Sequence, residues 1–200
     1  MIIVRNLGIQ PYVPIWRQMQ DFTSKRHAAT SDELWLLQHE PVYTQGQAGK
    51  AEHLLNNNLI PVIQSDRGGQ ITYHAPGQLI AYVLLDLRRL GIGVKSLVSK
   101  LEKLIIDVLA QYAILGRTKC LAPGVYVTNK KIASIGLRIK NGCTYHGIAL
   151  NVNLDLTPFQ NINPCGFQDL IMTQINDYMA SIQIAAVAEN LRAEFINSFG

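Results

Sequence analysis

The chain has 200 residues, 48% of them hydrophobic, and a formal net charge of +4. A chain of this length buries about 70% of its unfolded surface, so we expect one catalytic domain over residues 1–200 that needs no metal or disulfide for stability. We expect a cytoplasmic protein with reduced thiols, because the three cysteines are widely spaced and no secretory signal is present. It should not enter a membrane, because no apolar run approaches ~20 residues. The positive charge allows an acidic partner, nucleic acid or protein, but the lysines and arginines are scattered without a nucleic-acid-binding motif, so the signal for nucleic acid is weak.

The first half of the chain predicts several short strands and one helix. The helix follows Pro11 and Pro14, and Ile15, Met19 and Phe22 recur in it at helical spacing. The strands are expected at residues 1–7, 34–37, 42–44, 60–64, 71–73 and 79–85.

One short segment, residues 46–50, resembles part of a phosphate-binding loop. Its spacing is wrong, however, and no serine or threonine follows Lys50. The segment therefore argues against an ATP site and favours a transferase that uses a pre-activated donor.

The second half of the chain predicts a long helix, a β-meander and a closing helix. An apolar stripe from Val94 to Tyr112 indicates a helix that covers a sheet and stops by Gly116. Strands are expected at 124–128, 131–139 and 143–152, with the hairpin dipeptide Asn141-Gly142 before the last, and a closing helix at 182–199. Because the strands follow one another without alternating helices, the predicted fold class is α+β.

The chain is organised around residues 67–82, RGGQITYHAPGQLIAY. Gly68 and Gly69 let the backbone approach a ligand closely, and a strand and a Pro-Gly turn follow. Polar side chains at two tight turns favour recognition of a ligand; they are Arg67, Gln70, His74 and Gln78. A hairpin whose polar residues satisfy its own backbone is the alternative.

This stretch resembles the signature of the lipoyl(octanoyl) transferase family. The signature positions are filled by Arg67, Gly68, Gly69, Thr72, Tyr73, His74, Pro76, Gly77, Gln78 and Tyr82. The similarity continues through HEPVYTQGQAGKAEHLL, APGVYV, KIASIGLRI and NPCG, and covers residues 36 to 168. It implies the fold of biotin protein ligases and lipoate ligases: a single domain with a mixed or antiparallel sheet flanked by helices, and a smaller second sheet.

Three thiols are candidates for a nucleophile, and Cys165 is favoured. It lies in a predicted loop between Pro164 and Gly166, where a side chain is accessible and backbone N–H groups are free. The loop resembles the family motif Pro-x-Cys-Gly, with the proline shifted by one residue, which implies that Cys165 is catalytic. Zinc binding is disfavoured because the cysteines contain no C-x-x-C pair.

The resemblance pairs this thiol with Lys131, the first residue of the Lys-Ile-Ala-Ser motif. An ammonium beside the thiol would favour the thiolate, and a desolvated lysine can also act as a base. A solvated lysine at the start of a strand is the alternative reading, which suits the neighbouring Lys130. His74 and His146 are rival bases, to which we assign positioning roles.

An acyl pocket is expected around the same residues. The predicted substrate-binding residues are Arg67, Gly68, Gly69, Gln70, Ile71, Thr72, Tyr73, His74, Ser134, Ile135, Gly136, Gly147, Ile148 and Ala149. Small residues would leave room for a medium aliphatic chain, and glycine N–H groups could form an oxyanion hole. For Ser134 and the two later glycines, close strand packing is the alternative.

The resemblance implies transfer of an octanoyl group from octanoyl-acyl carrier protein to a lysine of lipoyl domains. The acceptors would be the lipoyl domains of 2-oxoacid dehydrogenase complexes and the glycine cleavage H protein. The reaction would pass through a Cys165 thioester and need no cofactor. The alternatives are an ATP-dependent lipoate ligase, a non-catalytic binder of carrier or lipoyl domains, and a cysteine hydrolase.

Overall fold

The computed structural model describes residues 2–56 and 59–200; Met1, included in the first predicted strand, lies outside them. The strands are β1 (Ile2–Gln10), β2 (Asp32–His39), β3 (Val42–Gln45), β4 (Val62–Gln64), β5 (Ile71–His74), β6 (Gln78–Leu84), β7 (Gly116–Arg117), β8 (Gly124–Val127), β9 (Lys130–Lys140) and β10 (Cys143–Asn151). The helices are α1 (Tyr12–Ser24), α2 (Leu87–Leu90), α3 (Val94–Ala110) and α4 (Ile184–Phe199), with short 3₁₀ turns between β10 and α4. Within the described ranges, no helix is both long and apolar enough to cross a bilayer.

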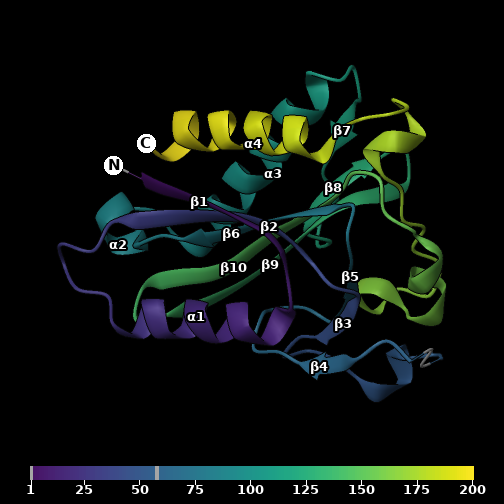
Figure 1. The fold of residues 1–200 in the computed structure, drawn as a ribbon, viewed down its shortest axis with the longest axis horizontal. Helices are drawn as coiled ribbons and strands as arrows, with labels where there is room; N and C mark the ends of the chain where they lie inside the picture. The colour runs from purple at the N-terminus through teal and green to yellow at the C-terminus, as the bar shows by residue number, and fades with distance from the viewer. Residues whose placement is uncertain (1, 57–58) are drawn as a thin grey trace.

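The large sheet has the strand order β1-β2-β6-β10-β9-β8-β7. Its neighbours pair antiparallel except for β1 and β2, which run parallel. Helix α1 covers one face of this sheet, and α3 and α4 cover the other (Figure 1). The predicted α+β class, with a mixed sheet flanked by helices, is confirmed.

The two faces of the large sheet carry separate hydrophobic clusters. On one face, Leu101 and Ile105 of α3 are fully buried in a cluster with sheet residues such as Val83. On the other, Ile15 and Met19 of α1 are buried against β2, β6 and β10. Each fully buried aliphatic side chain contributes about 1.5–3 kcal/mol, so both helices are held by tertiary packing.

The small sheet, in the order β4-β3-β5, forms the predicted second sheet. A third cluster, which includes Tyr43, Tyr73 and Phe159, packs it against the 3₁₀ turns after β10. The loop between β4 and β5 bridges the two sheets, since the N–H of Gly68 donates to the carbonyl of Leu137 on β9 at 2.9 Å.

The helix after Gly93 is shorter than predicted. It ends at Ala110, because Ala113 adopts a left-handed conformation with φ of 58°. The short helix α2 is missing from the predictions, although Asp86 caps it by accepting from two backbone N–H groups and Gly91 ends it with φ of 64°. The two-residue strand β7 is also missing from them.

Candidate active site

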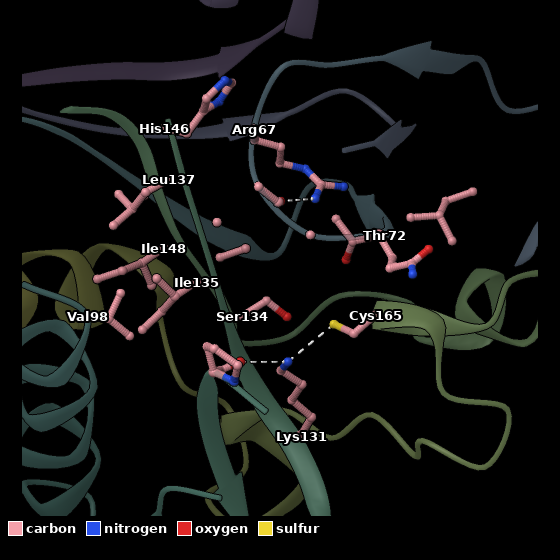
Figure 2. A pocket seen from close by; sticks show the side chains of 18 of the residues that line it. Arg67, Thr72, Val98, Lys131, Ser134, Ile135, Leu137, His146, Ile148 and Cys165 are labelled. Atoms are coloured by element: carbon pink, nitrogen blue, oxygen red, sulfur yellow. Dashed lines mark hydrogen bonds between the residues drawn. The ribbon is translucent and has the colours of Figure 1, made fainter. Parts of the chain in front are cut away.

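Lys131 and Cys165 meet at one end of a cavity, although 34 residues separate them in the chain. The Nζ of Lys131 donates to the Sγ of Cys165 at 3.2 Å and to the carbonyl of Pro123 at 2.9 Å (Figure 2). Lys131 is 2% exposed, which excludes the solvated alternative. The sequence thus brings an amine and a thiol into hydrogen-bonding contact.

The lysine is fixed from three sides. Its backbone bridges to the segment after Cys165, donating to Ile171 O at 2.8 Å and accepting from Thr173 N at 2.9 Å. The ring of Tyr126 lies 5.4 Å from Nζ, close enough for a cation–π contact. Because it is held in this way, the side chain loses little further freedom when it meets the thiol.

Cys165 is presented by a strained turn. It lies in the 3₁₀ turn Pro164–Gly166 with φ of 57° and ψ of 16°, a left-handed conformation that L-residues rarely adopt. The N–H of Gly166 closes the turn on Asn163 O at 2.9 Å. The side chain stays partly exposed, whereas Cys143 is buried and Cys120 is exposed on a loop, and neither of these lines the cavity.

The cavity has a volume of about 440 Å³, within the range typical of ligand sites. Its floor is the α1 face of the large sheet, where Ser134 pairs with Ala149 and Gly136 pairs with Gly147. These small side chains leave space above the sheet. Gly147 also fits the packing alternative, because a Cβ there would stand 2.1 Å from Ala81 O.

The loop between β4 and β5 forms the roof of the cavity. Arg67 is buried; its guanidinium donates to the Thr44 hydroxyl at 3.0 Å and to Gly68 O at 2.9 Å. Desolvation lowers the pKa of Arg67. Gln70 packs on Gly166, beside the reactive cysteine, and its Oε1 is buried with no hydrogen-bond partner among the described residues.

Both candidate histidines lie at the cavity but contact other groups. His74 bonds through Nε2 to the Thr44 hydroxyl at 3.1 Å and through Nδ1 to Gln78 Oε1 at 2.7 Å. His146 bonds through Nε2 to Asp66 at 2.8 Å. Burial lowers the pKa of both rings, which keeps them neutral near pH 7. Their hydrogen bonds suit the positioning roles assigned to them.

Apart from Tyr73, every residue predicted to bind substrate lines the cavity. The side chain of Tyr73 packs instead against the rings of Tyr43 and Phe159, at 5.4 and 5.5 Å between ring centroids. Pro123 and Asp66 are the main residues that the sequence did not single out. Pro123 supplies the second acceptor for Lys131, and it stands in the APGVYV motif that carries the family resemblance.

Asp66 anchors the roof of the cavity. Its carboxylate accepts from Trp16 and Gln20 on α1 and from Tyr145 and His146 on β10. These hydrogen bonds outweigh partial burial and hold the pKa of Asp66 well below its ordinary value. Since Asp66 directly precedes Arg67, they fix the start of the roof loop to both a helix and the sheet.

Comparison with known proteins agrees with this geometry. The model of the lipoyl protein ligase A/B catalytic domain matches residues 12–196. The chain is 58% identical to an octanoyltransferase of Legionella pneumophila (strain Lens), over 99% of this chain and 100% of that one. It is 56% identical to an octanoyltransferase of Pseudomonas fluorescens (strain SBW25), over 96% of this chain and 89% of the relative.

Solved structures share the fold at low sequence identity. Lipoate-protein ligase A bound with ATP matches with a TM-score of 0.79 and 16% identity, over 98% of this chain and 84% of that one. Biotin protein ligase from Aquifex aeolicus in complex with biotin and ATP matches with a TM-score of 0.60 and 12% identity, over 99% and 69%. The chain is therefore an acyltransferase that belongs to the lipoyl protein ligase A/B catalytic-domain family.

Proposed function

We propose that this protein transfers an octanoyl group from octanoyl-acyl carrier protein to a lysine of lipoyl domains, through a thioester on Cys165. The contact of 3.2 Å between Lys131 Nζ and Cys165 Sγ carries the proposal, since a nucleophilic thiol needs a partner that takes its proton. The relatives are named octanoyltransferase, and this name is the reason for proposing octanoyl as the transferred acyl group. The acceptors are the lipoyl domains of 2-oxoacid dehydrogenase complexes and the glycine cleavage H protein.

In the first step, the thiolate of Cys165 attacks the carbonyl carbon of the donor thioester. A new carbon–sulfur bond forms, the bond to the carrier sulfur breaks, and the Lys131 ammonium gives its proton to the leaving thiolate. The products are the octanoyl-enzyme and the free carrier thiol. Exchange of one thioester for another is nearly isoenergetic, so the step needs no ATP.

In the second step, the neutral amine of the acceptor lysine attacks the thioester on Cys165. The carbon–nitrogen bond forms, Cys165 leaves as a thiolate, and Lys131 takes the proton that the amine loses. The carbonyl of Pro123 holds Nζ in place in both steps, because it accepts from the amine but takes no proton at neutral pH. Formation of the amide makes this step favourable.

The octanoyl chain would lie over the small residues of the cavity floor. Ser134, Gly136 and Ala149 present little side-chain bulk, and Ile80 lies beside Ala149 on the next strand. The roof loop, in which Arg67 is buried, would cover one side of the reacting thioester and so limit its hydrolysis to free fatty acid.

Mass spectrometry tests the proposal. The protein is mixed with octanoyl-acyl carrier protein, its intact mass is measured, and the adduct is located by peptide mapping. We expect a gain of one octanoyl group on the peptide that contains Cys165, followed by its loss when a lipoyl domain is added. A protein that modifies the lipoyl domain only with ATP and free acid, and without this adduct, would be a ligase instead.

A further inference from the structure

The peptide group between Pro123 and Gly124 lies between α3 and the reactive amine. Its carbonyl oxygen, on Pro123, accepts from Lys131 Nζ at 2.9 Å, one of the two contacts of that amine drawn in Figure 2. Its N–H, on Gly124, donates to a carboxylate oxygen of Glu102 on α3, also at 2.9 Å. One peptide group is therefore hydrogen-bonded at both ends, to side chains that come from a helix and from a strand.

These contacts form a continuous chain of hydrogen bonds from α3 to the thiol. The chain runs from the Glu102 carboxylate through the peptide group to Lys131 Nζ, and from Nζ to Cys165 Sγ at 3.2 Å. Hydrogen bonds in such a chain polarise and strengthen one another. A bond from a backbone N–H to an ionised carboxylate is also roughly twice as strong as a neutral one. The chain thus ties the amine to a helix that does not itself carry either reactive group.

The geometry of the peptide group makes its two contacts depend on each other. A trans peptide is planar, with its N–H and C=O on opposite sides, and the described residues contain no cis peptide bond. A carboxylate that fixes the N–H therefore also fixes the direction of the carbonyl. Gly124, with φ of 127°, is the residue type that best tolerates a rotated peptide, because it has no Cβ. Rotation would turn the N–H toward Lys131 and take away an acceptor from the amine.

Glu102 is placed for this contact. It follows the fully buried Leu101 on α3 and is itself half-buried at the edge of the apolar stripe. Gly124 is buried, so its N–H requires a partner. Within residues 2–56 and 59–200, the Glu102 carboxylate forms no ion pair, whereas the other acid of α3, Asp107, pairs with Lys103 at 2.6 Å. The Glu102 side chain is therefore directed at the backbone of β8.

We infer that Glu102 is a positioning residue for the reactive amine. It holds the Pro123 carbonyl toward Lys131, and this acceptor keeps Nζ in contact with the sulfur of Cys165. The inference rests on the proposed function, in which Cys165 attacks the donor and Lys131 moves the proton. An uncharged amide oxygen can accept from the same N–H, so the role requires an acceptor at this position more than it requires a charge.

The test compares three substitutions on α3. Glu102→Ala removes the acceptor, Glu102→Gln keeps an acceptor oxygen without the charge, and Asp107→Ala removes a carboxylate of the same helix that pairs at the surface. Alanine favours helix, so α3 should persist, and urea unfolding checks that each variant is folded. Alkylation of Cys165 by iodoacetamide is followed on its own peptide by mass spectrometry, between about pH 6 and pH 10.

We expect Glu102→Ala to slow alkylation of Cys165 about fivefold at pH 7, because the displaced amine stabilises the thiolate less. At pH 10 the rates should converge, since the thiol then ionises without the amine. Glu102→Gln should recover most of the lost rate, and Asp107→Ala should match the unmodified protein. In a Lys131→Ala background, Glu102→Ala should cause no further slowing, because the group through which it acts is absent.

Other outcomes overturn the inference. If Glu102→Gln reacts as slowly as Glu102→Ala, the charge acts on the thiol and the oriented peptide does not. If Glu102→Ala slows the Lys131→Ala protein as much as it slows the unmodified one, Glu102 does not act through the amine. Equal slowing at every pH would show that access to the sulfur has changed instead. A protein that forms no octanoyl adduct would contradict the proposed function, whereas the alkylation rates decide the role of Glu102 in either case.

Discussion

Gly124 packs directly against the side chain of Lys131. A Cβ at this position would stand 2.7 Å from Lys131 Cε and 2.4 Å from Ala133 O, and the backbone has φ of 127°. Glycine at this point therefore lets the lysine run along β8 to the thiol.

The first prediction follows from this contact. Gly124→Ala should displace the Lys131 amine and slow acylation of Cys165 at least about tenfold, because small misplacements of reacting groups are costly. The positive φ should also cost about 1–3 kcal/mol of unfolding free energy. Stopped-flow acylation and urea unfolding measure the two effects. Gly93→Ala is the control, since a Cβ there meets no atom within 4 Å.

The second prediction concerns the choice of thiol. Cys165→Ala should abolish octanoyl transfer, whereas Cys120→Ala and Cys143→Ala should stay within about twofold of the unmodified protein, because neither thiol lines the cavity. The assay is transfer to a lipoyl domain, read by mass. Substantial transfer by Cys165→Ala would eliminate the thioester mechanism.

The third prediction concerns the amine. Lys131→Ala should move the alkylation of Cys165 by iodoacetamide to higher pH, because the thiolate loses an adjacent cation at 3.2 Å. The measurement is the alkylation rate between pH 6 and pH 10, with roughly tenfold slower reaction expected at pH 7. Lys130→Ala is a matched control, since Lys130 is exposed and does not line the cavity. Identical pH profiles for both variants would remove Lys131 from this role.

The fourth prediction concerns stability in mild acid. Burial lowers the pKa of His39 from 6.5 to about 4. In the folded protein, Nδ1–H donates to Gln10 O at 2.9 Å, so Nε2 accepts from the Tyr82 hydroxyl at 2.6 Å. Below pH 6.5, His39 binds a proton in the unfolded chain but stays neutral in the folded chain. The free energy of unfolding therefore keeps its full value above that pH and falls toward pH 4, by up to about 3 kcal/mol.

Urea unfolding at pH 7 and at pH 4.5 measures this loss. His39→Gln should reduce the difference between the two pH values, although the buried His74 and His146 keep part of it. The exposed His27 provides the control, and His27→Gln should retain the full difference. An undiminished difference in His39→Gln would show that another group causes the acid sensitivity.

Local patterns predicted most of the secondary structure. The stripe on α3 and the proline at the start of α1 located both helices, because such signals act within one or two turns. The sequence did not reveal that β2 and β3, separated by Pro41, belong to different sheets, or that β1 and β2 run parallel. Strand partners depend on contacts far apart in the chain, which periodicity does not record.

In the candidate site, too, local motifs were predicted and contacts between distant segments were not. The family motifs led to Lys131 and Cys165, which lie in contact. Tyr73 was expected at the cavity as part of the stretch 67–74, but alternate side chains of a strand face opposite sides, and Tyr73 packs in the small-sheet cluster. Asp66 was missed because its four donors come from two distant elements, and a single aspartate beside Arg67 carries no such information.

The backbone of Lys131 is hydrogen-bonded to the segment that follows the Cys165 turn: its N–H donates to the carbonyl of Ile171, and its carbonyl accepts from the N–H of Thr173. The amine and the sulfur therefore lie on two chain segments that are joined by backbone hydrogen bonds, independently of the contact between the two side chains. Small motions of the outer strands would move both reactive groups together, and the amine and thiol would separate only when these backbone hydrogen bonds break.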